Sequence, residues 1–136
     1  MKQPINKRRK DVRQEISDRI LKALFESDKR IRYCAIIGEK GEEIVGGMRH
    51  GIKSLEPERA SSRLRMQTLI GMALNKNWND VLGDADYIIA HRSKVMLFIF
   101  PLAGLRSVLI SAEPEYPLEE FRRIADVARG FPKEFG

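Results

Sequence analysis

Five glycines lie between residues 32 and 51, in RYCAIIGEKGEEIVGGMRHG, and glycine-rich stretches are a frequent sign of a phosphate-binding loop. A P-loop needs two glycines five residues apart, followed directly by a lysine that reaches the phosphates. Gly41 and Gly46 have this spacing, but Gly47 stands where the lysine is required and Lys53 is out of frame. No G-x-G-x-x-G fingerprint of a dinucleotide site occurs either. The pattern therefore predicts glycines that serve the backbone, either in a turn and a bulge or where another strand approaches closely.

No other residues form a recognised catalytic or metal-binding pattern. Neither His50 nor His91 has a second ligand three or four residues away, as a zinc site would. No serine stands in a G-x-S-x-G motif. Three acidic residues lack the spacing of a calcium loop, and we expect them to end a helix and to be solvated: Asp80, Asp84 and Asp86. The sequence therefore predicts no enzyme activity, no catalytic residue, no cofactor and no metal.

Length and composition indicate one globular domain. A chain of 136 residues can bury a core but is short for two domains, and its hydrophobic share of 43% is ordinary. No apolar run approaches the roughly 20 residues of a membrane-spanning helix, and no secretory signal is recognisable. Cys34 is the only cysteine, so we expect a small core residue, no internal disulfide and a reducing, cytoplasmic location.

The positive charge is concentrated at the N-terminus. The net charge of the chain is +6, and five basic residues without an acidic one lie in residues 1–10. Four of them are adjacent: Lys7, Arg8, Arg9 and Lys10. Because these cations repel one another and have no apolar partners, we expect residues 1–10 to form a flexible tail or to extend the first helix. Residues 11–136 are then a single, nearly neutral domain.

The hydrophobic pattern alternates between helical and strand periods in a simple order. Apolar residues three and four apart predict a helix, and dense β-branched runs bounded by turn residues predict strands. We expect helices over residues 12–27, over 57–82 with a break near 75–79, and after Pro117; the strands are Ile31–Ile37, Glu43–Met48, Tyr87–Ala90, Val95–Phe100 and Val108–Ala112. Short links favour antiparallel pairs. The predicted fold is α+β, in the order α-β-β-α-β-β-β-α, with helices on both faces of a five-stranded antiparallel sheet.

The second helix is apolar on more than one side. Met66, Ile70, Met72 and Trp78 spread apolar surface around it, while Gly71 flattens one flank. Two interpretations remain open: the whole stripe belongs to the core, or one side faces the core and the other faces a second copy of the chain.

The order of elements over residues 11–131 is similar to the roadblock-type dynein light-chain fold, which is related to longin and profilin-like modules. Four stretches carry a closer likeness: IIGEKGEEIVGGMRHGI, the helix after EPER, the hairpin HRSKVMLFIFPL and the final VLISAEPE. In these stretches the sequence resembles an archaeal family of roadblock-like proteins.

The resemblance implies a non-enzymatic module. Roadblock-type proteins form homodimers through their second helix and third strand, which join two sheets into one, and many are platforms or regulators for small GTPases. Carried onto this chain, the dimer surface would be residues 57–82 with Tyr87–Arg92. Within it the expected contact residues are Met66, Ile70, Met72, Tyr87 and Ile89.

Three functions follow as hypotheses. The first is a cytoplasmic homodimeric scaffold or regulatory module that binds a protein partner, with a small GTPase as one candidate. The alternative is a nucleic-acid-associated protein that holds phosphates through Lys7, Arg8, Arg9 and Lys10. The third is a sensor with a small ligand between sheet and helix.

A binding experiment can distinguish a basic tail that contacts phosphates from one that is merely solvated. If it contacts phosphates, the full chain binds duplex DNA and RNA at low salt with little sequence preference. Four to five neutralised phosphates should then weaken binding steeply at near-physiological salt. Base stacking is not expected, since no aromatic residue lies among the cations. A chain beginning at Asp11 is the comparison, and equal affinity of the two chains would exclude the tail as a nucleic-acid contact.

Overall fold

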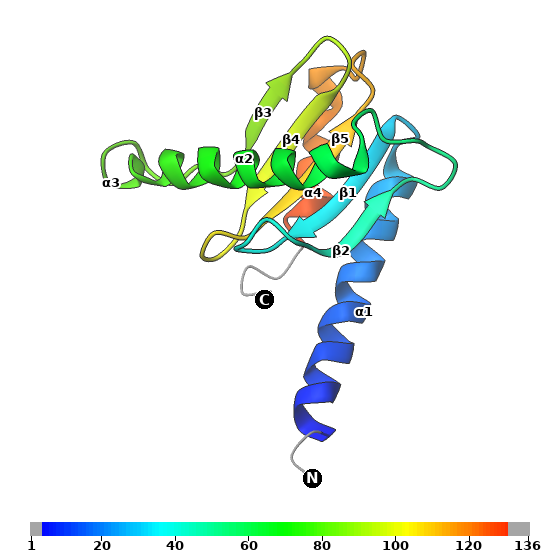
Figure 1. Cartoon of the computed structure of the whole chain (residues 1–136), viewed down its shortest axis with the longest axis vertical. Helices are drawn as coiled ribbons and strands as arrows, with labels where there is room; N and C mark the ends of the chain where they lie inside the picture. The colour runs from blue at the N-terminus through cyan, green and yellow to red at the C-terminus, as the bar shows by residue number, and fades with distance from the viewer. Residues whose placement is uncertain (1–3, 131–136) are drawn as a thin grey trace.

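The computed structural model describes residues 4–130 and, among their side chains, those of 14–57 and 60–130. Its helices and strands follow one another as α1 (Pro4–Ser27), β1 (Ile31–Ile37), β2 (Glu43–Met48), α2 (Glu58–Lys76), α3 (Asn79–Leu82), β3 (Ile88–His91), β4 (Met96–Pro101), β5 (Ser107–Ala112), the 3₁₀ helix η1 (Leu118–Glu120) and α4 (Phe121–Ala128). Figure 1 shows one sheet with α2 lying across one face and α1 and α4 on the other.

The five strands form a single sheet in the order β2-β1-β5-β4-β3, and every neighbouring pair is antiparallel. Successive strand residues point to opposite faces, so each strand contributes to two separate clusters of buried side chains. Cys34 and Ile36 belong to the cluster that α1 and α4 cover, whereas Ala35 and Ile37 belong to the one beneath α2. The predicted fold class and order of elements are confirmed.

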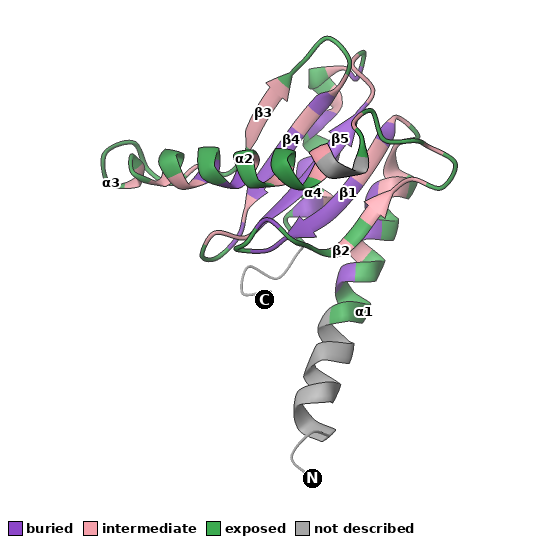
Figure 2. Cartoon of the chain, in the orientation of Figure 1, coloured by how far each residue is buried: buried purple, intermediate pink, exposed green. Residues whose placement is uncertain are grey.

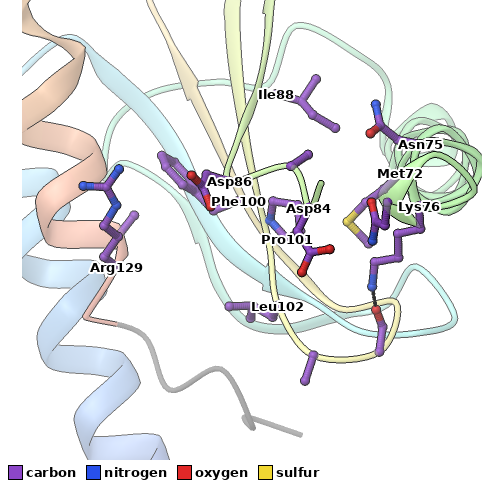
Figure 3. A pocket seen from close by; sticks show the side chains of 15 residues that line it. Met72, Asn75, Lys76, Asp84, Asp86, Ile88, Phe100, Pro101, Leu102 and Arg129 are labelled. Carbon is purple, nitrogen blue, oxygen red and sulfur yellow. Dashed lines mark hydrogen bonds between the residues drawn. The ribbon is translucent and has the colours of Figure 1, made fainter. Parts of the chain in front are cut away.

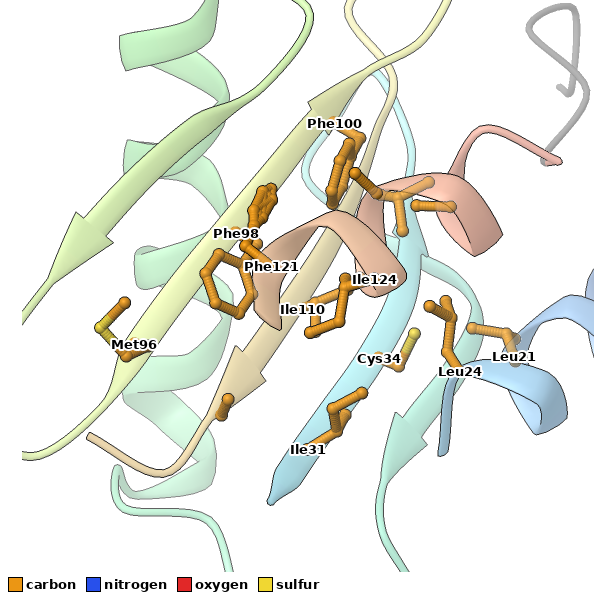
Figure 4. Close-up of a cluster of buried hydrophobic side chains, with 14 of the residues drawn as sticks. Leu21, Leu24, Ile31, Cys34, Met96, Phe98, Phe100, Ile110, Phe121 and Ile124 are labelled. Carbon is orange, nitrogen blue, oxygen red and sulfur yellow. The ribbon is translucent and has the colours of Figure 1, made fainter. Parts of the chain in front are cut away.

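The cluster on the α1–α4 face is the larger core. Phe98 of β4 stacks on Phe121 of α4, with ring centroids 4.9 Å apart, and the ring of Tyr116 packs edge-on against Phe98 at 5.5 Å. Leu21 and Leu24 bring α1 onto the same cluster (Figure 4). Burial of this many large apolar side chains fixes α1 and α4 on this face.

Two details of the expected helices are settled by the structure. The break near residues 75–79 is present, because α2 ends at Lys76 and α3 begins at Asn79. Helix α1 begins at Pro4, so the backbone of residues 4–10 extends the first helix. This is one of the two alternatives expected for the tail. The four polyanion-binding candidates, Lys7, Arg8, Arg9 and Lys10, lie outside the described side chains, and their role stays a prediction.

The glycine-rich stretch forms the β1–β2 hairpin. Gly41 has a φ of +78° in the turn, where its N–H donates to the carbonyl oxygen of Gly38 at 3.0 Å. Gly46 pairs with Ala35 at a φ of +116°, and a Cβ there would lie 2.2 Å from the carbonyl oxygen of Cys34. The glycines thus serve the backbone, through a turn and a close approach of two strands. The irregular register of this pair falls between Ile36 and Ile37, away from the glycines.

Replacing Gly46 with alanine should therefore destabilise the fold. The new Cβ meets the β1 backbone, which cannot move aside as a side chain would, and the positive φ adds strain of about 1–3 kcal/mol. We expect a loss of about 3 kcal/mol or more in the free energy of unfolding, measured with chemical denaturant. Gly47→Ala is the matched control, because Gly47 also has a positive φ, of +155°, but no atom lies within 4 Å of its Cβ position. Equal losses for both variants would contradict the close approach.

Candidate protein-interaction surface

Helix α2 is packed unusually lightly for its length. It has 19 residues, yet Leu69 and Met72 are its only buried side chains among those described. These two residues are three positions apart and face the sheet. There they pack in one buried cluster with Ala35, Ile37, Ile99 and Leu109. Figure 2 shows the contrast, with α2 largely green and the strands behind it purple. Most of the surface of α2 therefore remains available for contacts outside the chain.

The end of α2 reaches past the sheet. Figure 1 shows the last turns of α2, together with α3, extending beyond the edge strand β3. We call residues 74–86 the overhang. Four large apolar side chains in it are exposed: Leu74 (60%), Trp78 (59%), Val81 (75%) and Leu82 (76%). Single exposed apolar residues are normal, but four on one projecting segment indicate a contact surface.

The overhang also carries negative charge. Asp80, Asp84 and Asp86 are all exposed, and none makes an ion pair with another described residue. The expectation that they end a helix and are solvated agrees with this placement, since α3 ends just before Gly83.

A pocket of about 540 Å³ lies between the first half of α2, the loop before it and the face of the sheet. We call it the α2 pocket. Its apolar wall includes Leu55, Leu64, Leu97 and Leu109, of which Leu55 is 55% exposed. The surface of the sheet is left open here because α2 crosses nearer to the beginning of β3, whereas the pocket lies near the end of that strand. A cavity of this size is in the range that binds a ligand or an inserted side chain.

Basic side chains line the same pocket. Arg32 is held by Glu113 at 3.0 Å and by the carbonyl oxygen of Lys53 at 2.9 Å, and Arg65 donates to the carbonyl oxygen of Gly41 at 3.0 Å. Two more cations, Arg92 and Lys94, come from the β3–β4 hairpin and are exposed.

Two acidic side chains of the α2 pocket are already engaged by hydroxyl groups. Glu43 accepts a hydrogen bond from the Tyr33 hydroxyl at 2.6 Å, and Glu56 accepts one from Ser61 at 3.0 Å. Burial, together with the bond to Glu43, raises the pKa of Tyr33 well above its ordinary value, so the phenol stays neutral. Four cations against the two carboxylates Glu43 and Glu56 give the lining of the α2 pocket a net positive charge.

A second groove of about 440 Å³ lies under the other half of α2. Figure 3 shows Met72 and Ile88 on one side of it, and Phe100 and Leu102 on the other. The Lys76 ammonium donates to the carbonyl oxygen of Gly104 across its end, which ties α2 to the β4–β5 turn. Among the described residues, only a few contacts therefore hold α2 in place near β3.

The structure distributes the expected dimer residues over three environments. Met66 and Ile70 are exposed on α2, and Met66 lies beside Gly41 in the β1–β2 turn. Met72 is only 2% exposed and belongs to the core beneath α2, so its expected exposure is wrong. The reason is its helical phase, which it shares with Leu69 rather than with Ile70.

The two expected residues near β3 face the core on the α4 side. The ring of Tyr87 packs edge-on against Phe121 at 4.8 Å, although 46% of the residue is exposed. Ile89 packs against the same cluster. Whether these residues touch a second copy stays a prediction. The backbone of β3 presents a free edge, as does that of β2 at the other side of the sheet. The sequence analysis missed the α2 pocket and its cations, since they come from segments far apart in the chain.

The residues considered for chemistry are not brought together. Cys34 is fully buried, and burial raises the pKa of its thiol far above the ordinary value, which leaves it unreactive. Within residues 14–57 and 60–130, no three His, Cys, Asp or Glu side chains gather as metal ligands would. No described helix is long and apolar enough to cross a membrane.

Arg49, which follows the two glycines, has a structural role. Its guanidinium donates to the carbonyl oxygens of Phe25, Asp28 and Ile31, each at 2.7 Å, and lies over the ring of Phe25. Phe25 lies in the last turn of α1, where a cation is favoured by the helix dipole, and Asp28 and Ile31 follow the end of the helix. The motif GGMR thus joins the hairpin to α1.

Solved structures with a similar architecture include MglB proteins and a Roadblock/LC7 domain. The gliding protein MglB from Thermus thermophilus superposes with a TM-score of 0.71 at 12% identity, over 88% of this chain and 87% of that one. A Roadblock/LC7 domain from Streptomyces avermitilis gives 0.60 at 11% identity, over 84% and 89%. A structure of MglB with a tetrameric arrangement gives 0.66 at 15% identity, over 87% and 89%. No protein-family model and no curated protein sequence matches the chain.

These likenesses define the class. The chain has the roadblock fold, an α+β architecture with five antiparallel strands between one helix on one face and two on the other. The fold expected from the sequence is confirmed. At 11–15% identity the likeness concerns the fold, and function has to be argued from the surface.

The hairpin geometry predicts that the purified protein does not bind ATP or GTP stoichiometrically and does not hydrolyse them. The glycines lead into a second strand rather than a helix N-terminus, and no lysine follows Gly46 to hold the phosphates. Calorimetric titration with each nucleotide and magnesium should show no saturable heat. Saturable binding of one nucleotide per chain would contradict this interpretation.

Proposed function

We propose that this protein is a non-enzymatic homodimeric scaffold or regulatory module that binds a protein partner on the α2 side of its sheet. The observation that carries the proposal is the overhang, which exposes four large apolar side chains beyond the sheet edge. Strand β3, which follows the overhang in the chain, has one edge with no strand beside it. A second copy that pairs along β3 satisfies this edge and comes to lie beside the overhang.

The position of α2 determines how two copies meet. Antiparallel pairing of β3 with β3 of a second copy places a two-fold axis at the middle of the strand. Helix α2 passes near Ile88, at the beginning of β3, since Met72 packs in the cluster that includes Ile88. The rotation carries the second α2 to the other end of β3, beside His91. The two helices then lie side by side on one face of a ten-stranded sheet.

One flank of α2 faces this second helix. Leu64 lies on that flank, because it lines the α2 pocket together with Arg92 of the β3–β4 hairpin. Gly71 comes two helical turns later on the same flank, and no atom lies within 4 Å of its Cβ position. A glycine here allows the helices to approach closely.

The opposite flank supports a platform for another protein. Met66 and Ile70 are 39% and 52% exposed and lie away from the flank of Leu64 and Gly71. In the dimer they stay in solvent, so we assign them to the partner surface instead of the dimer contact. A small GTPase is the partner class that the roadblock resemblance suggests. Self-association of a similar fold is supported by the tetrameric arrangement of MglB. The cytoplasmic location expected from the lone cysteine agrees with such a role.

Gly71→Glu should convert the dimer into a folded monomer. The new carboxylate is placed between the two helices without a partner, and burying it costs several kcal/mol. We expect the dissociation constant of the dimer to rise about a hundredfold or more, measured by light scattering across a dilution series. The monomer fold should persist in circular dichroism, because glutamate favours a helix more than glycine does.

Ile70→Glu is the matched control for this prediction. It adds the same charge to the same helix at the neighbouring position, which is 52% exposed and which the proposed dimer leaves in solvent. It should leave the dimer intact. A wild-type protein that is monomeric at micromolar concentration, or a Gly71→Glu variant that dimerises like the wild type, would refute the proposed arrangement.

A further inference from the structure

We infer that the overhang of each chain seats in the α2 pocket of the second copy, so that the dimer is locked by two reciprocal insertions. The inference rests on the proposed dimer and adds to it a specific contact, which the pairing of β3 alone does not require. It assigns an occupant to the α2 pocket, whose volume is about 540 Å³.

The first argument is position. The two-fold axis at β3 exchanges the two ends of this strand. The overhang leaves its own sheet beside Ile88, which lines the second groove together with Asn75 and Lys76, whereas the α2 pocket opens beside Arg92, past the opposite end of β3. A second copy rotated about the axis therefore projects its overhang over the open part of the first sheet. Helix α2 of the first chain does not block it there, since its side chains beside the pocket are Ser61, Leu64 and Arg65.

The second argument is apolar complementarity. Trp78, Val81 and Leu82 extend from the overhang with more than half of their surface exposed. The α2 pocket offers an apolar wall of matching character, formed by Leu55, Leu64 and Leu97. A buried aromatic residue in a partner's pocket is a typical energetic centre of an interface. Each insertion removes both apolar surfaces from water.

The third argument is charge. The overhang carries Asp80, which is exposed and makes no ion pair with other described residues of its own chain, whereas Asp84 and Asp86 line the second groove of the same chain. The rim of the α2 pocket carries Arg92 and Lys94, for which the described residues likewise provide no ion pair. Opposite charges on the two surfaces favour this docking and disfavour alternatives. A second copy thus matches the pocket in position, polarity and charge.

Trp78 is the only tryptophan of the chain, which makes it a direct reporter. In the dimer its emission should be blue-shifted and protected from acrylamide, and both effects should disappear on dilution to monomers. Leu55→Glu, a change in the α2 pocket, should expose Trp78 again, although Trp78 does not line the pocket of its own chain. Leu118→Glu is the control, because Leu118 is similarly exposed but lies in η1 and does not line the pocket.

A charge exchange tests the same contact without relying on fluorescence. One variant carries Arg92→Asp and Lys94→Asp, and the other carries Asp80→Lys. Each variant alone opposes like charges at both insertions, and its dimer should weaken about tenfold or more. In a heterodimer of the two variants, one insertion brings the two sets of changed residues together, with opposite charges. The other insertion brings together the residues that both variants keep from the wild type. The mixture should therefore form heterodimers more tightly than either variant forms homodimers. Circular dichroism of each variant establishes that it is folded.

The outcomes separate the inference from the proposed function. Blue-shifted, protected Trp78 together with rescue in the mixture supports the insertion. A wild-type dimer in which Trp78 stays fully accessible to acrylamide, or in which the mixture is no tighter than the separate variants, overturns the insertion and leaves the β3-paired dimer standing. A wild type that remains monomeric overturns both.

Discussion

The two apolar faces of the sheet are covered unequally, and this imbalance organises the rest of the molecule. On one face α1 and α4 bury a continuous aromatic and aliphatic cluster around Phe98 and Phe121. On the other face α2 contributes only Leu69 and Met72 among its described side chains. Apolar surface that the chain does not cover itself remains as a driving force for association. The overhang, the open pocket and the free edge of β3 all lie on this side or at its border.

The sequence predicted the elements well because their periodicities are local. The dense run around Phe98, the turn at Gly41 and the weakening of helical spacing near Asn77 are each readable within about ten residues. Met72 was misplaced because α2 has apolar residues on several flanks, so that the buried phase depends on the sheet beneath it. The α2 pocket was invisible for a similar reason, since Leu55, Arg92 and Leu109 meet only after the strands have paired.

The stretch that looked most like a chemical site has mechanical roles instead. Gly46 brings β2 against β1, and the next residues carry the chain to Arg49, whose guanidinium binds three carbonyl oxygens at and after the end of α1. One hairpin thereby connects the sheet to α1 on the well-covered face. A side chain this fully engaged is not available to bind a phosphate, which agrees with the absence of a lysine after Gly46.

In the proposed dimer, the uneven cover also ties the stability of α2 to self-association. A helix that buries two side chains gains little from packing, and its order then depends on contacts with another molecule. Binding to a second copy stabilises only the folded chain, so α2 and the overhang should become more stable as the protein concentration rises. The partner surface around Ile70 is carried by the same helix. Dimer formation would therefore order the platform before a partner arrives, and a partner that binds both helices would in turn stabilise the dimer.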